Sequence, residues 1–186
     1  MADVKRIPDE ALRSIAAQIA ERLPPRMTTW SLRRPRLAES LPIHALDEVP
    51  PAGVPLSEAA QQTPFWHHQI HHPQGKTTTA RSMESDGAWK VMEVGAAPMA
   101  MELDAAIDRV DLEAPDDWDA RLLLVPDYHV AGIWLHSVDA EDDLVSVVAR
   151  PAGMAMLEKT VLYSATTFLM LLRDYRPSLG VPIIDE

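Results

Sequence analysis

Seven of the sixteen prolines lie between residues 24 and 55, and this uneven distribution constrains the fold more than any other feature. Proline fixes one backbone angle and has no N–H group, so it interrupts regular hydrogen bonding. Before this segment, apolar residues recur at helical spacing between Asp9 and Leu23, which predicts an amphipathic helix. We therefore predict that residues 1–56 form this helix and an extended or irregular arm. Residues 57–186 would form a single domain.

The arm combines arginines with apolar side chains, a mixture that a disordered linker rarely has. We expect it to lie on the acidic body of its own chain or on a neighbouring subunit, which would make the protein an oligomer. An equally supported alternative is that the arm is a loosely tethered tail. The candidate partner-binding residues are Arg26, Trp30, Arg33, Arg34, Arg36 and Leu37.

The body shows three strand patterns, a helical pattern, three more strand patterns and a last helix. Short turns such as Pro73-Gln74-Gly75 favour antiparallel neighbours. The class is α+β: an antiparallel sheet of five to six strands, with a second helix between the two three-strand sets. A long C-terminal helix over residues 153–175 should pack along the sheet. Methionines such as Met101 and Met156 fall on the two predicted body helices; we expect most of them in the core, although Met also suits binding surfaces.

Charge and composition exclude several classes of function. The net charge of −11 is the sum of +1 on residues 1–56 and −12 on residues 57–186, so the body repels phosphate and we expect no nucleic-acid binding. The absence of cysteine excludes disulfides and thiolate zinc sites. The longest uncharged apolar run, residues 160–172, is shorter than the ~20 residues that a membrane span needs. With no signal-peptide pattern at residues 1–8, we expect a cytoplasmic protein without a membrane span.

Four of the seven histidines lie within the segment Trp66–His72, and histidine is the side chain that most often binds metals and moves protons. The candidate ligands are His67, His68, His71 and His72. In a strand, His67 and His71 share one face and His68 and His72 the other, with about 13 Å between the members of a pair. That spacing is too long for one metal ion, so we predict no metal and no other cofactor unless residues across the sheet, such as His129, His136 or Asp127, contribute.

No motif fixes a reaction. Asp127 could orient His129 as a general base, and His68 is a third catalytic candidate, but no nucleophile accompanies them. The sequence contains neither a phosphate-binding glycine loop nor a G-x-S-x-G elbow. Structural roles for these histidines are the simpler interpretation.

The order of elements is similar to that of class I secretion chaperones, which are dimers that wrap an extended segment of a partner. The similarity covers the order of the body elements and no residue signature. The sequence therefore favours a non-enzymatic protein-binding module: an adaptor, a chaperone-like protein or an assembly component that uses the arm and the acidic body. The competing hypothesis is a metal-dependent or His-based enzyme with a site around Trp66–His72 and Asp127–His129.

Overall fold

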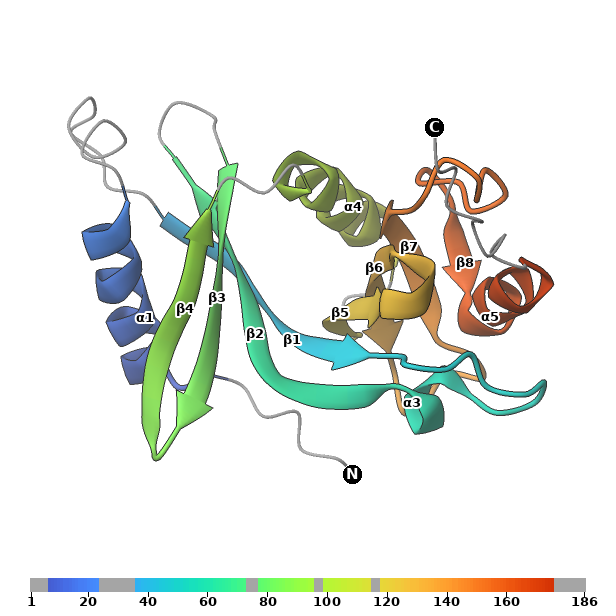
Figure 1. The fold of residues 1–186 in the computed structure, drawn as a ribbon, viewed down its shortest axis with the longest axis horizontal. Coiled ribbons are helices and arrows are strands. Elements are labelled where there is room, and N and C mark those ends of the chain that lie inside the picture. The colour runs from blue at the N-terminus through green and yellow to red at the C-terminus, as the bar shows by residue number, and fades with distance from the viewer. Residues whose placement is uncertain (1–6, 24–35, 73–76, 96–98, 115–117, 176–186) are drawn as a thin grey trace, which may run out of the picture.

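The computed structural model describes residues 7–23, 36–72, 77–95, 99–114 and 118–175, and all structural statements concern these residues (Figure 1). They form an α+β fold around one mixed sheet of eight strands, in the order β4-β3-β2-β1-β5-β6-β7-β8. The elements are α1 (Asp9–Arg22), β1 (Arg36–Ala45), α3 (Leu56–Ala59), β2 (Gln61–His71), β3 (Thr77–Ser85), β4 (Ala88–Gly95), α4 (Ala100–Glu113), β5 (Asp119–Val125), η1 (Pro126–Tyr128), β6 (Val130–His136), β7 (Leu144–Ala149), β8 (Leu162–Ser164) and α5 (Ala165–Asp174).

The sheet consists of two antiparallel halves that meet at β1 and β5, which are parallel to each other. The hairpin between β3 and β4 turns through Asp86 and Gly87, whose φ angles of 54° and 74° suit a two-residue turn of the mirror-image type. Pro42 lies inside β1, and the pairing with β2 shifts between Pro42 and His44. Such an irregularity accommodates the missing N–H of a proline inside a sheet.

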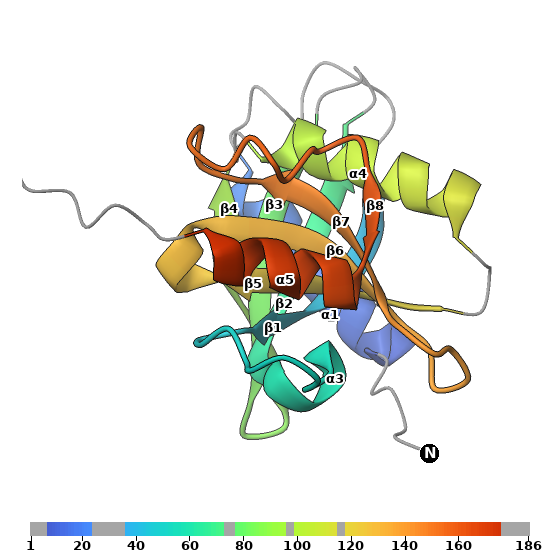
Figure 2. The ribbon, with the colours of Figure 1, turned by 90° about the vertical axis from the view of Figure 1, so that its right-hand side faces the viewer.

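The helices cover both faces of the sheet. Trp66 and Ile70 of β2 pack under α1, whereas the alternate residue Gln69 donates a hydrogen bond to the Ala100 carbonyl of α4, so α1 and α4 lie on opposite faces. Leu123 packs under α5 and the neighbouring Leu122 under α4. Figure 2 shows β6 and β7 running between α5 and α4. Hence α4 covers the middle of one face, and α1 and α5 cover the two ends of the other.

The structure corrects several of the sequence predictions. The sheet has eight strands and is mixed, rather than antiparallel with five to six strands. Residues 36–45, predicted as part of an irregular surface arm, form the central strand β1. The predicted helix 9–23 corresponds to α1, and the predicted second helix corresponds to α4.

The predicted long C-terminal helix over residues 153–175 is also wrong, because α5 begins only at Ala165. Ser164 sets this start: its hydroxyl accepts a hydrogen bond from the Thr167 N–H at 3.2 Å, which caps the helix. Turns bring Met154 and Leu157 into the same core as α5, so their apolar spacing resembled a helical stripe without forming one.

Candidate functional site

Three of the four clustered histidines, His67, His68 and His71, lie on β2 and alternate between its two faces as their spacing predicted, and His72 directly follows the strand. His68 is fully buried between two hydroxyls: its Nδ1 lies 2.9 Å from Ser40 Oγ, and its Nε2 lies 2.6 Å from Ser82 Oγ. Burial, and then the neighbouring His67, lower the pKa of His68 to about 4. A neutral imidazole between two hydroxyls joins three neighbouring strands, so His68 has a structural role.

The other three histidines of the segment have separate surroundings. His67 lies on the α4 face; burial lowers its pKa to about 4, and its Nε2 has no hydrogen-bond partner among the residues that the structure describes. His71 is half exposed with its Nε2 3.0 Å from Asp104, and the Nε2 of His72 lies 2.9 Å from the Thr78 hydroxyl. Across the described ranges, no three His, Asp or Glu side chains come close enough to hold a metal ion.

The catalytic candidates Asp127 and His129 lie in the connection between β5 and β6, and both are exposed. His129 adopts a left-handed conformation with φ of 51° and ends the short helical turn η1. Neither side chain takes part in a hydrogen bond or ion pair with another residue that the structure describes. His136 lies at the opposite end of the β5–β6 hairpin, so the structure does not bring these candidates together.

Four of the six predicted partner-binding residues, Arg26, Trp30, Arg33 and Arg34, lie outside the described residues. The backbone of Arg36 begins β1, opposite His71 of β2. Leu37 is half buried and packs against the apolar cluster beneath α1.

A polar cluster that the sequence did not reveal lies on the α5 side of β5 and β6. Asp143 accepts hydrogen bonds from the indole N–H of Trp134 and from Nδ1 of His136, both at 2.9 Å. The guanidinium of Arg121 stacks over Trp134 at 4.5 Å from the ring centroid, and the His44 ring meets Trp134 edge-on at 5.1 Å. Burial, and then Arg121, lower the pKa of His44 to about 4.

The pairing of His136 with Asp143 would have been hard to find from sequence. The two residues lie seven positions apart, and only the β6–β7 turn folds them together. Asp143 is 8% exposed, and its two oxygens accept from two different rings. This arrangement fixes the turn against the sheet, since a buried carboxylate needs such donors.

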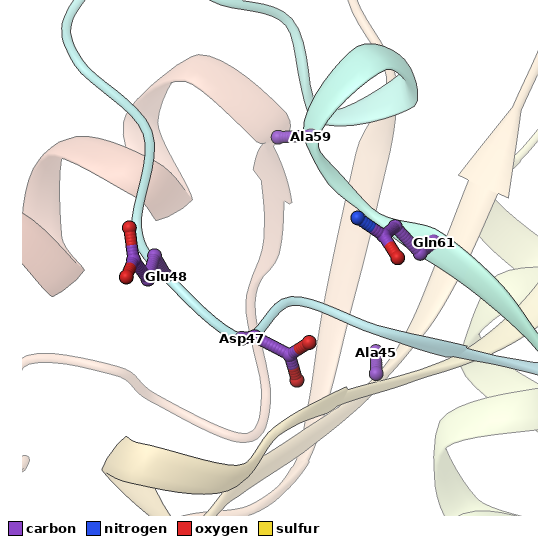
Figure 3. Close-up of a pocket in the computed structure, with 5 residues that line it drawn as sticks. All are labelled: Ala45, Asp47, Glu48, Ala59 and Gln61. Carbon is purple, nitrogen blue, oxygen red and sulfur yellow. The ribbon is translucent and has the colours of Figure 1, made fainter.

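A small pocket opens where β1 ends and β2 begins (Figure 3). The carboxylate of Asp47 and the amide of Gln61 extend into the space between the two segments, and no basic side chain lines it. The lining residues are Ala45, Asp47, Glu48, Ala59 and Gln61. The lining offers two carboxylates and one amide, and no histidine, hydroxyl or basic side chain accompanies them.

The strongest candidate for a functional surface is the outer side of α4. Its buried side includes Leu103, Ala106 and Val110, whereas Met101 is 78% exposed and Leu112 is 86% exposed. With Ala105 and Asp108, these two residues form a stripe along the helix, which we call the α4 outer face: Met101, Ala105, Asp108 and Leu112. Met156 and Met170 are exposed as well, so the prediction that most methionines of the two predicted body helices are in the core is wrong.

Carboxylates border the α4 outer face. Glu39 of β1 lies near Asp111 of α4; partial burial, and then the Asp111 charge, raise the pKa of Glu39. Within the described part of the chain, Glu39, Asp108 and Asp111 form no ion pair. The one basic residue of α4, Arg109, points inward and donates hydrogen bonds to the Ser146 hydroxyl and the Lys159 carbonyl. The surface is therefore acidic as well as apolar.

Among the helices of the described residues, none combines the length and apolar character needed to cross a membrane. Comparisons of the chain with protein-family models, with curated proteins and with solved structures find no match, so the similarity in element order to secretion chaperones stays a sequence-based prediction.

Proposed function

We propose that this chain is a non-enzymatic protein-binding module, acting as an adaptor, a chaperone-like protein or an assembly component. The observation that carries the proposal is the exposure of Met101 and Leu112 on a helix whose opposite side is buried. Burying a large aliphatic side chain stabilises a complex by about 1.5–3 kcal/mol. Two such side chains, about 16 Å apart along one helix, are suited to anchor a partner.

The competing proposal, a metal-dependent or His-based enzyme, has less support. Its centre at Trp66–His72 contains histidines that point to opposite faces, and its second centre at Asp127–His129 lies in an exposed turn. The ring of His68 is held by two hydroxyls and is inaccessible. These surroundings favour structural roles for the histidines.

Site-specific photo-crosslinking in cells of the source organism tests the proposal. A crosslinking residue replaces Met101 or Leu112 in the full chain, and the same residue at Met170, an exposed methionine of α5, serves as the matched control. We expect the same proteins to be crosslinked from positions 101 and 112 but not from position 170. These crosslinked proteins should be lost when the chain carries Leu112→Glu. Identical products at all three positions would contradict a docking role for α4.

A further inference from the structure

The chemistry of the partner can be inferred from the charges around the α4 outer face; this inference rests on the proposed function. Glu102, Asp104, Asp108, Asp111 and Glu113 make α4 strongly acidic. Asp104 accepts hydrogen bonds from three side chains of β2 and β3, and Glu102 pairs with Lys159 at 2.9 Å. The remaining three carboxylates have no cationic partner among the described residues.

Glu39 adds a fourth unpaired carboxylate next to the helix. Burial first, and then repulsion from Asp111, raise the pKa of Glu39, while His71 acts in the opposite direction, so the folded chain holds two like charges near each other with only this half-exposed histidine to offset them. A cation placed between them would relieve the repulsion. An anionic partner, such as a nucleic acid or an acidic protein surface, would increase it.

The apolar residues of the same surface favour a partner that carries apolar side chains as well as positive charge. Met101 and Leu112 lie three turns apart, with Asp108 between them on the stripe. A small inorganic cation would gain nothing from these side chains. A peptide that places aliphatic or aromatic residues beside basic ones would contact both the apolar ends and the acidic border.

We infer that the α4 outer face, together with Glu39 and Asp111, binds a basic amphipathic segment of a partner protein, in which Lys or Arg alternates with aliphatic or aromatic residues. The apolar residues supply most of the affinity, and the carboxylates supply selectivity and faster association. The segment would be about as long as α4, which has 14 residues.

Fluorescence anisotropy with two synthetic peptides tests this inference on the full chain. One peptide is a 14-residue Leu/Lys amphipathic helix, matched to α4 in length, and the other has Gln at every Lys position. We expect the Lys peptide to bind about tenfold more tightly at low salt, and high salt to reduce this difference. The double variant Glu39→Gln/Asp111→Asn should lose the preference.

The control variant is Asp139→Asn/Glu141→Gln, which removes the same charge from exposed positions in the β6–β7 turn. It should keep the full preference for the Lys peptide. If both peptides bind equally and Leu112→Ser abolishes both, the docking surface stands and the basic partner is wrong. If neither peptide binds, the inference and the proposed function both fail.

A third probe distinguishes a foreign partner from a second copy of this chain. Residues 24–36 carry four arginines beside Trp30 and Leu32, the same chemistry as the inferred segment. A peptide of this sequence should bind no more tightly than the Leu/Lys peptide. Clearly tighter binding, lost in Glu39→Gln/Asp111→Asn, would overturn the foreign partner and assign the surface to another copy.

Discussion

The side-chain amide of Gln18 donates a hydrogen bond to the carbonyl oxygen of Trp89, at 2.9 Å, on the outer edge of the sheet. The same amide accepts a hydrogen bond from the Val91 N–H at 3.0 Å, so a single side chain from α1 replaces a peptide group of a neighbouring strand. An uncovered edge strand is a template for pairing with other chains. Gln18 therefore satisfies two groups that would otherwise allow strand addition at β4.

Gln18→Leu should destabilise the protein and promote association. It leaves two partly buried backbone groups without partners, which costs about 1–3 kcal/mol each at most, and it opens the edge of β4. Urea denaturation measures the first effect, and light scattering at increasing protein concentration measures the second. The control is Gln18→Glu, which retains an acceptor for the Val91 N–H. Its free energy of unfolding should lie between those of the unsubstituted protein and Gln18→Leu. An unchanged midpoint in Gln18→Leu would show that water replaces the amide fully.

Asp143→Ala should be among the more damaging changes of a single polar residue. It leaves the buried indole N–H of Trp134 and the ring of His136 without their acceptor. Breaking such a buried network costs about 3–5 kcal/mol. Asp139→Ala, in the same turn but exposed, should shift the free energy of unfolding by less than about 0.5 kcal/mol. Equal effects of the two variants in chemical denaturation would contradict the structural role of Asp143.

Acid should destabilise the fold between about pH 6.5 and pH 4. Burial lowers the pKa of His44, His67 and His68 to about 4, against 6.5 as the ordinary value. The unfolded chain therefore takes up protons first as pH falls, so the stability from the neutral rings is complete above pH 6.5 and is lost toward pH 4. Each ring contributes a slope of up to about 1.4 kcal/mol per pH unit. Glu39, with its raised pKa, acts in the opposite direction.

The measurement is the free energy of unfolding across this pH range in His67→Leu. This variant replaces a buried ring whose Nε2 has no partner in the described part of the chain, so it should flatten the pH dependence by about one proton. The matched control is His129→Gln, which removes an exposed ring in place of a buried one. A slope that His67→Leu does not alter would mean that the His67 ring protonates as readily in the folded chain as in the unfolded one.

Local patterns predicted the parts of the fold that local interactions determine. The apolar periodicity of α1 and α4 lies within short segments, and these helices appear where they were expected. The predicted turn Pro73-Gln74-Gly75 lies outside the described residues. Strand β1 was missed because it is held by β2 and β5, and β5 lies more than 70 residues away in the sequence. Pro42 within the strand argued against a strand here, and the shifted pairing after Pro42 explains how a proline fits there.

The outer side of α4 could have been predicted from the sequence. The buried side of α4 contains Leu103, Ala106 and Val110, and helical geometry places Met101 and Leu112 off that side. The expectation that most of the methionines lie in the core rests on residue type alone and overlooks the position of Met101 on the helix. The repulsion between Glu39 and Asp111 could not be predicted, since it depends on α4 crossing over β1.

Deletion of residues 1–56 should unfold the protein, because it removes the strand that joins the two halves of the sheet. β1 pairs with β2 on one side and with β5 on the other, and Leu41 and Ile43 are buried beneath α4. Deleting residues 1–6 removes none of the helices and strands that the structure describes and is the control. Circular dichroism and thermal melting should show a cooperative transition in the shorter deletion and none in the longer one. A folded, monomeric product lacking residues 1–56 would mean that β2 and β5 can pair directly, and that the arm is separable from the body after all.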